Sequence, residues 1–133
     1  MKYLLDTNVC ITFLSQRNPV LNQRFSSVSA QDKIVCSIVR AELYYGVYKS
    51  QRQQINLLRI DSFLAHLPTL PFDDHAARIY GVLRADLESK GTPIGSNDLQ
   101  IAAIALASHF TLVTHNTAEF SRIPHLVLDD WES

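Results

Sequence analysis

Short apolar runs alternate along the chain with longer segments in which apolar residues recur every three or four positions. The runs cover residues 3–5, 33–36, 111–114 and 125–128. A short, nearly continuous apolar run is typical of a strand that is buried on both faces of a parallel sheet. Because such runs alternate with helical segments, the pattern predicts an α/β fold, with a four- or five-stranded, mainly parallel sheet sandwiched between helices.

Helices are expected between these runs, and several of their boundaries carry local signals. Pro19 stands in the first turn of one helix, where proline is favoured, and Ser37 and Asp73 are suitable N-caps for two others. The segment 91–97 contains glycine and proline and is therefore predicted to be a loop. The expected helices are 7–16, 19–30, one from 37 to beyond 48, 51–66, 73–90 and 97–109, and 70–72 is expected to be a brief strand or an extended link.

The length of 133 residues fits one domain spanning 1–133. Hydrophobic residues make up 47% and charged residues 19% of the chain, which is an ordinary globular composition. No apolar run approaches the roughly 20 residues of a membrane-spanning helix, and because the opening residues pass directly into an apolar run and Asp6, we expect no signal segment. Cys10 and Cys36 both lie in apolar stretches, so we expect a cytoplasmic protein with reduced, buried cysteines.

The charge balance gives a further constraint on possible partners. A net charge of −1, with the 12 Lys and Arg residues scattered along the chain, disfavours binding of nucleic acid through a broad basic face. If the substrate is a nucleic acid, a bound metal or local positive charge must therefore offset its phosphates.

Acidic and amide residues stand where predicted strands end or helices begin. Asp6 follows the first run, Glu42 lies on the helix after the second, and Asp98 opens the helix after the glycine-proline loop. Asn116 follows the fourth run, and Glu119 comes one turn later. Because the carboxyl ends of parallel strands share one edge of the sheet, we expect these side chains to converge there.

The helical pattern also predicts that two of these acids face inward. Asp98 lies on the same stripe as Ile101, and Glu42 shares one side of its helix with Ile38 and Tyr45. An inward carboxylate is costly unless it is paired, protonated or bound to a metal ion. The predicted edge is therefore a candidate metal site.

The chemistry of the predicted ligands favours one class of metal. Clustered carboxylates repel one another, and a divalent cation removes that repulsion. Since the set offers only oxygen ligands and no His or Cys residues stand at zinc spacing, the pattern indicates Mg²⁺ or Mn²⁺ rather than Zn²⁺. Such sites typically carry phosphoryl chemistry, in which the metal lowers the pKa of a bound water and stabilises the leaving oxygen.

Each residue taken alone also has a purely structural interpretation. Asp6 is a possible helix cap, and Asp98 a partner of the helix dipole. Glu42 would be a surface acid if the helix phase differed, Asn116 a turn residue and Glu119 a solvated helix acid. The joint position of all five at one predicted edge favours the functional interpretation.

Two other active-site chemistries can be weighed from the sequence. Five histidines leave open a metal-free cleavage of RNA through its 2′-OH, although they show no compact pairing, and His115 lies closest to the predicted edge. The opening strand followed by Asp6 also suggests a haloacid-dehalogenase-like phosphatase. That signature needs a second Asp two residues later, where this chain has Asn8.

Several segments together resemble the PIN-domain nucleases, and specifically the VapC toxins of bacterial type II toxin–antitoxin systems. The opening 4–8, which reads Leu-Leu-Asp-Thr-Asn, and 41–43 with the following glycine are two of them. The longest is 91–102, which contains the glycine-proline loop with its Asn-Asp pair and is the most specific. Segments 112–116, 119–120 and 128–131 complete the resemblance, which spans nearly the whole chain in the expected order.

The resemblance implies a three-layer PIN-like α/β/α sandwich and a Mg²⁺-dependent endoribonuclease, with Mn²⁺ as a substitute metal. Asp6, Glu42 and Asp98 would form its acidic centre. Many PIN domains add a fourth acid where this chain has Asn116, so Glu119 or a substrate phosphate would supply the missing charge. The further residues that would hold waters or orient the carboxylates are Thr7, Asn8, Asn97 and Thr114.

The resemblance also implies partners. Members of this subgroup resemble nucleases that cut initiator tRNA in its anticodon stem-loop, which matches recognition of RNA by shape and splayed bases. A cognate VapB antitoxin, a homodimer and contact with operator DNA only through the antitoxin are implied as well. The alternatives are a PIN nuclease of RNA processing without an antitoxin, and a binding module that has lost catalysis.

Overall fold

In the computed structural model, which describes residues 1–133, five strands form one sheet in which every neighbouring pair is parallel. The predicted fold class, an α/β sandwich around a mainly parallel sheet, is confirmed. The strands, in the spatial order β3-β2-β1-β4-β5, are β1 (Tyr3–Leu5), β2 (Lys33–Cys36), β3 (Thr69–Leu70), β4 (Thr111–Val113) and β5 (Leu128–Asp129).

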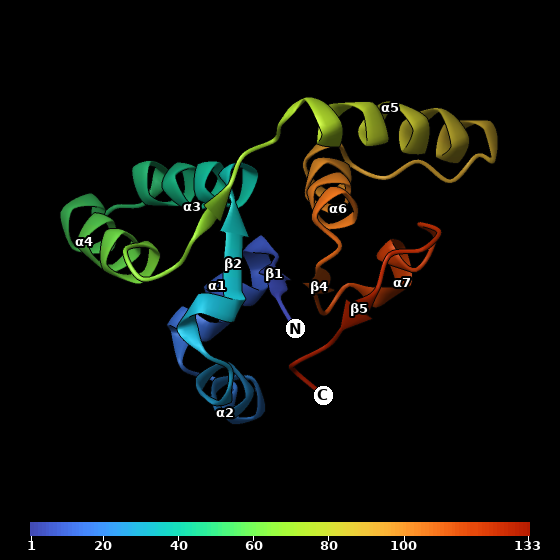
Figure 1. Cartoon of the computed structure of the whole chain (residues 1–133). Helices are drawn as coiled ribbons and strands as arrows, with labels where there is room; N and C mark the ends of the chain where they lie inside the picture. Colours follow the sequence, from blue (N-terminus) through green and yellow to red (C-terminus); the bar gives the residue numbers. More distant parts are fainter.

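Helices flank the sheet on both sides (Figure 1). In that view α1 to α4 lie in the left half of the picture, around β1, β2 and β3, and α5 to α7 lie in the right half, around β4 and β5. None of the helices combines the length and the apolar character needed to span a membrane. The helices are α1 (Thr7–Ser15), α2 (Pro19–Ser27), the 3-10 turn η1 (Ala30–Asp32), α3 (Ser37–Lys49), α4 (Gln53–Leu64), α5 (Asp74–Ser89), α6 (Ser96–Ser108) and α7 (Thr117–Phe120).

The strand order places a switch point at the centre of the sheet. The chain builds β2 and β3 on one side of β1, and then crosses to build β4 and β5 on the other. Leu5 pairs with Val113, and the backbone N–H of Asp6 donates to the Val113 carbonyl at 3.1 Å. Asp6 and Thr114 therefore emerge side by side where the topology reverses, the place at which open α/β sheets bind ligands.

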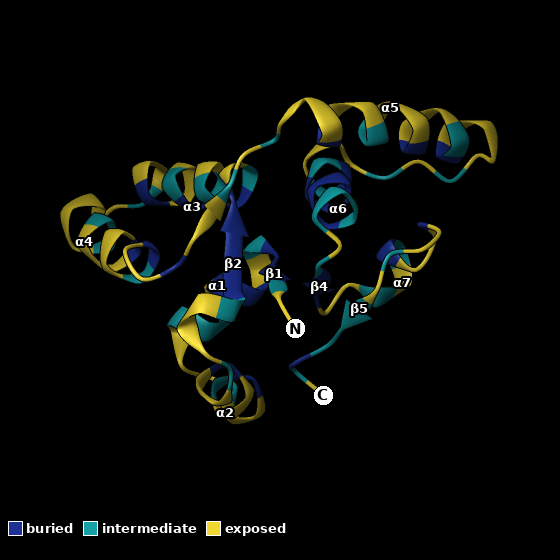
Figure 2. Cartoon of the chain, in the orientation of Figure 1, coloured by how far each residue is buried: buried dark blue, intermediate teal, exposed yellow.

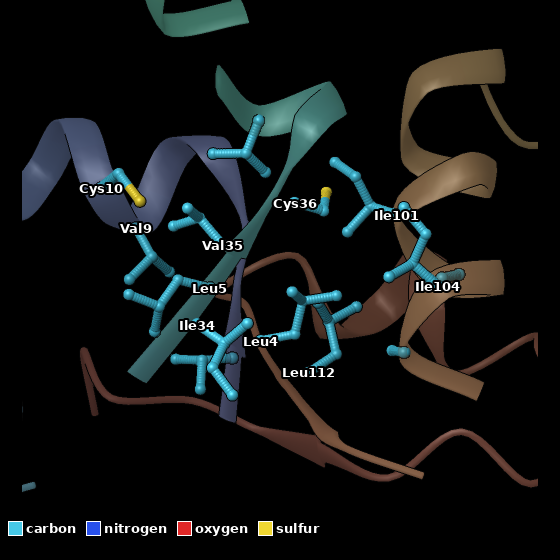
Figure 3. Close-up of a cluster of buried hydrophobic side chains, with 14 of the residues drawn as sticks. Leu4, Leu5, Val9, Cys10, Ile34, Val35, Cys36, Ile101, Ile104 and Leu112 are labelled. Carbon is cyan, nitrogen blue, oxygen red and sulfur yellow. The ribbon is translucent and has the colours of Figure 1, made fainter. Parts of the chain in front are cut away.

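One continuous apolar core holds these elements together (Figures 2 and 3). Leu4 and Leu112 of the central strands are fully buried, as are Ile101 and Ala102 of α6, whose small alanines allow close packing against the sheet. Cys10 and Cys36 are free and buried, which confirms the predicted reduced core cysteines. Since β1 is enclosed from both faces, the residue that ends it has a fixed position.

Three local predictions were wrong. The second helix ends at Ser27 rather than near Ala30, in a serine-rich stretch that competes with helical hydrogen bonding. The last strand is Leu128–Asp129 rather than 125–128, because His125 adopts a left-handed φ of 67° within a turn. Tyr45 does not face inward with Glu42, since it is 66% exposed while α3 buries Val39, Leu43 and Val47.

Candidate active site

Asp6 has both of the roles that its sequence position allowed. Its Oδ1 accepts a hydrogen bond from the Val9 N–H at 2.8 Å, so it caps α1. It is also only 6% exposed, and this burial raises the pKa of its carboxyl group. Hydrogen bonds from Thr114 and Val9 oppose that rise, and the charges of Glu132 and Glu42 add to it. A buried carboxylate facing two other acids is suited to binding a cation.

Glu42 approaches this edge from α3. Its Oε1 accepts a hydrogen bond of 2.6 Å from Thr7 Oγ1, which joins the start of α1 to the middle of α3. The side chain is half-buried. Thr7, predicted to orient a carboxylate, therefore contacts Glu42 directly.

Asp98 stands in the first turn of α6 and is half-buried. The pKa of its carboxyl group is raised to about 6, mainly by burial and then by the neighbouring carboxylates of Glu119, Glu42 and Asp6, in that order. Four acids, one just after β1 and the others on α3, α6 and α7, thus act on one another at a single edge. The convergence expected from the strand ends is present in the geometry.

Asn116 and Glu119 occupy different parts of the edge. Asn116 is exposed, its backbone N–H donates to Thr114 Oγ1 at 3.1 Å, and its amide Nδ2 lies 3.3 Å from Glu119 Oε2. Glu119 is the acid that acts most strongly on Asp98 through its charge. The carboxylate next to Asp98 therefore comes from Glu119, on α7, and not from the position after β4.

Two polar clefts open beside these acids, and neither is lined by a hydrophobic residue. A cleft of about 390 Å³ is lined by Glu42, Gly95, Ser96, Asn97 and Asp98. A cleft of about 320 Å³, hereafter the tail-side cleft, is lined by Asp6, Asn8, Thr12, His115, Asn116 and Glu132. Asn8 and Asn97 thus line the clefts, while Thr7 and Thr114 hold the carboxylates.

A larger groove, of about 540 Å³, lies between α1, α3 and α4 and meets the acidic edge only at Glu42. Its floor is mostly apolar, with Leu43 and Ile60 among the lining residues. Asp6 and Asp98 line the polar clefts instead, so the size of this groove does not make it the candidate active site.

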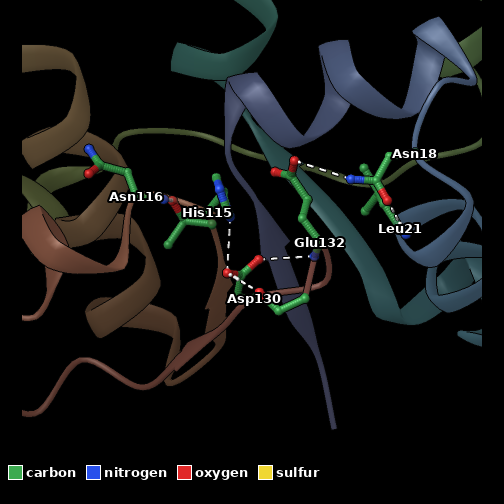
Figure 4. Close-up of polar contacts among 8 residues, drawn as sticks. Asn18, Leu21, His115, Asn116, Asp130 and Glu132 are labelled. Carbon is green, nitrogen blue, oxygen red and sulfur yellow. Dashed lines mark hydrogen bonds and ion pairs between the residues drawn. The ribbon is translucent and has the colours of Figure 1, made fainter.

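The chain end contributes site residues that the sequence reasoning missed. Asp130 Oδ2 lies 3.0 Å from His115 Nδ1, and Glu132 follows on the same segment (Figure 4). Potential ligand atoms of these three residues lie within 4.8 Å of one another. The signals available in the sequence were the acid-rich ending around Trp131 and the family resemblance of 128–131, but the burial of Trp131 could not be foreseen.

The donor set fits a hard divalent cation. Asp6, Glu42, Asp98 and Glu119 offer only carboxylate oxygens, the ligands that Mg²⁺ and Mn²⁺ prefer. Burial is the main cause of the raised pKa of Asp98, and the charges of Glu119, Glu42 and Asp6 add to it, so a bound cation would relieve both the desolvation and the repulsion. Nitrogen and sulfur ligands are absent from this set, which disfavours zinc.

The PIN domain family model matches residues 3–126. The chain is 41% identical to Ribonuclease VapC2 of Rickettsia felis, over 99% of both proteins. It is 37% identical to the tRNA(fMet)-specific endonuclease VapC of Salmonella typhimurium, over 98% of both.

Solved structures give the same result for the fold. The structure is similar to a crystal structure of VapBC2 from Rickettsia felis bound to a promoter DNA fragment, with a TM-score of 0.90, 41% identity and coverage of 98% of this chain and 99% of that one. It is also similar to DNA-bound VapBC from Salmonella typhimurium, with a TM-score of 0.92, 37% identity and coverage of 98% of both chains.

Proposed function

Because the chain belongs to the PIN-domain family and, within it, to the VapC ribonucleases, we propose that it is a Mg²⁺-dependent endoribonuclease and the toxin of a type II toxin–antitoxin pair. The convergence of four carboxylates at the switch point carries this proposal. Family membership supports the use of a divalent metal, and the all-oxygen donor set favours Mg²⁺.

Asp6 and Asp98 are proposed to hold the cation, and Glu42 either completes the ligand set or accepts the proton of the attacking water. A bound divalent cation lowers the pKa of water and stabilises the charge on the leaving oxygen. The chain prepares this chemistry by fixing its carboxylates before substrate arrives. Asp6 is held by Val9, and Glu42 is held by Thr7.

The proposed substrate is tRNA, and specifically the anticodon stem-loop of initiator tRNA. Support comes from the 37% identity to a relative named for its specificity toward tRNA(fMet). A loop presents unstacked nucleotides whose backbone can enter a cleft at a sheet edge, which a regular RNA helix does not. Sequencing RNA 5′ ends after brief induction of the wild type and of Asp98→Asn tests this assignment. Cuts dispersed over mRNA would contradict it.

A VapB-type antitoxin is the proposed partner, in a complex built on a homodimer of this chain that contacts operator DNA only through the antitoxin. Relatives solved as VapBC complexes with DNA support this proposal, and the proposed tRNA substrate favours a cytoplasmic location. An adjoining antitoxin gene whose product co-purifies with the chain and suppresses cleavage is the expected result. Without such a gene, the alternative of an RNA-processing nuclease would be favoured.

The catalytic assignment has a direct test with a matched control. Asp98 and Asp74 both stand in the first turn of a helix, but Asp74 is exposed on α5 and lines neither polar cleft. Asp98→Asn is expected to lower RNA cleavage at least about 100-fold, since losses around a metal site typically cost 10–100-fold even outside the ligands. Asp74→Asn should cleave normally.

Removal of the metal completes this test. EDTA should abolish cleavage by the wild type, and added Mg²⁺ should restore it. Equal activity of Asp98→Asn and Asp74→Asn, or full activity in EDTA, would overturn the proposed function and favour a metal-free mechanism.

A further inference from the structure

The end of the chain is anchored beside the active site by one aromatic residue. Trp131 is 1% exposed, and its ring packs edge-on against Tyr3 of β1 with centroids 5.2 Å apart. Its indole N–H donates to Asp129 Oδ2 at 3.1 Å. Because both neighbours of Asp130 are held through this anchor and β5, Asp130 has a defined place in the fold.

Asp130 in turn orients the imidazole of His115. Its Oδ1 accepts from the Glu132 N–H at 2.9 Å, and its Oδ2 accepts from Ser133 Oγ at 3.0 Å. The same Oδ2 lies 3.0 Å from His115 Nδ1, so Nδ1 carries the proton of that hydrogen bond (Figure 4). The opposite ring nitrogen, Nε2, is left free, and the side chain is 63% exposed.

The imidazole of His115 can supply positive charge to a cleft that is otherwise acidic or neutral. His115 is the one basic residue among those lining the two polar clefts, and it shares the tail-side cleft with Asp6. The acids around it would repel the phosphates of RNA. The same acids favour a charged imidazole, because hydrogen bonding to Asp130 and the charges of Glu132 and Asp6 raise the pKa of His115.

We propose that His115, oriented by Asp130, donates a hydrogen bond from Nε2 to a phosphate oxygen of RNA lying in the tail-side cleft. His115 is then a substrate-binding residue, and Asp130 is its positioning residue. Asn8 and Asn116, which line the same cleft, supply neutral hydrogen-bond donors along the bound RNA. This inference rests on the proposed ribonuclease function.

The test is RNA cleavage kinetics at about pH 6.5 with a short single-stranded oligonucleotide, for wild type, His115→Ala, His115→Gln and the control His66→Ala. His66 is exposed at the end of α4, outside both clefts. His115→Ala and His115→Gln should raise KM roughly tenfold with kcat little changed, because a charge-assisted bond to substrate is lost.

Salt dependence separates a phosphate contact from a merely structural role. The slope of log(kcat/KM) against log[salt] should fall by about 0.7 in His115→Ala, the value expected for one lost contact to single-stranded RNA. His115→Lys should restore the slope. Asp130→Asn should raise KM less than His115→Ala does, and the double variant should resemble His115→Ala alone, because Asp130 acts through His115.

Two results would overturn the inference. One is a KM and salt slope for His115→Ala equal to those of His66→Ala, and the other is a fall in kcat with KM unchanged. Melting curves that match the wild type verify that each variant folds. Asp98→Asn in the same series keeps the two proposals apart: if it is inactive while His115→Ala is normal, the ribonuclease function stands and only the role of His115 fails.

Discussion

On one flank of the acidic edge, the carboxylates stand at the ends of buried strands and in helices; on the other, they stand on the last residues of the chain. Asp6 is 6% exposed and hydrogen-bonded to the first turn of α1. His115 is 63% exposed and is held through Asp130 on the terminal segment. The first, which we call the buried flank, is built into the sheet. The second, which we call the tail flank, depends on the end of the chain packing against the sheet.

This difference separates two tasks that a nuclease must combine. Groups that bind a cation benefit from burial, where electrostatic interactions are strong and positions are fixed. A group that meets a large polyanion must instead be reachable from solvent. We expect changes at the buried flank to remove catalysis, and changes at the tail flank to weaken substrate binding. The predictions below test that division, from the largest effect to the smallest.

Replacement of Trp131 should break the tail flank with the greatest cost in stability. Trp131→Ala removes a fully buried side chain that contacts Tyr3 and Phe25, so the free energy of unfolding should fall by about 3–5 kcal/mol. Urea denaturation measures this loss. The released tail should also raise KM for RNA as His115→Ala does, while Mg²⁺-dependent cleavage persists in the protein that remains folded.

Trp131→Phe provides the milder comparison. It keeps most of the apolar contact and loses the hydrogen bond from the indole N–H to Asp129, so its cost should be about 1–2 kcal/mol. A cost for Trp131→Ala below about 1 kcal/mol would show that the tail is not anchored by this residue.

The anchoring of the tail also explains which parts of the site could be predicted from sequence. Asp6 could be predicted because a buried strand, its end and the following cap are all local features of one short segment. Asp130 could not, because its place depends on Trp131 meeting Tyr3 and Phe25, more than one hundred positions away in the sequence. Only the folded chain brings those rings together.

The same reasoning applies to the fold. The apolar run of β4 predicted a buried strand, because burial on both faces leaves a strong pattern. The edge strand β5 was misplaced, since two paired residues leave almost no pattern and the left-handed His125 could not be foreseen. The prediction that Tyr45 faces inward was wrong for a related reason. When apolar and polar residues occur on both faces of a helix, the sequence does not reveal which face is buried.

Variants of Asp6, on the buried flank, can separate its role as the cap of α1 from the effect of its negative charge. Asp6→Asn keeps an oxygen that can accept the Val9 hydrogen bond but removes the negative charge. It should lower cleavage about 100-fold or more while leaving the free energy of unfolding unchanged or raised, because a buried carboxylate among other acids is disfavoured.

Asp6→Ala removes the cap as well. It should lose the same activity and be about 1 kcal/mol less stable than Asp6→Asn, the usual cost of a missing N-cap acceptor. Cleavage rates with thermal or urea unfolding of both variants provide the measurement. If Asp6→Asn retained normal cleavage, Asp6 would be only a helix cap.

The smallest expected effect is a pH dependence of stability that belongs to the buried flank alone. The pKa of Asp98 is raised from 3.8 to about 6 in the folded chain. Between these values the folded state holds more protons than the unfolded state, so metal-free stability should fall as pH rises through this window and level off above it. Screening at a half-buried site should limit the change to about 1 kcal/mol, or a few degrees in Tm.

Comparison with Asp98→Asn isolates this contribution, because other groups titrate in the same range and are common to both proteins. In EDTA, the stability of the wild type relative to Asp98→Asn should be higher at about pH 5 than at about pH 7. Mg²⁺ at the higher pH should raise the Tm of the wild type and leave that of Asp98→Asn nearly unchanged, since a ligand stabilises only the state that binds it. A stability difference that stayed constant with pH, together with equal responses to Mg²⁺, would show that Asp98 neither has a raised pKa nor binds the cation. His115→Ala should respond to Mg²⁺ like the wild type, because His115 belongs to the tail flank, which is proposed to bind substrate, and not to the buried flank, which is proposed to bind the metal.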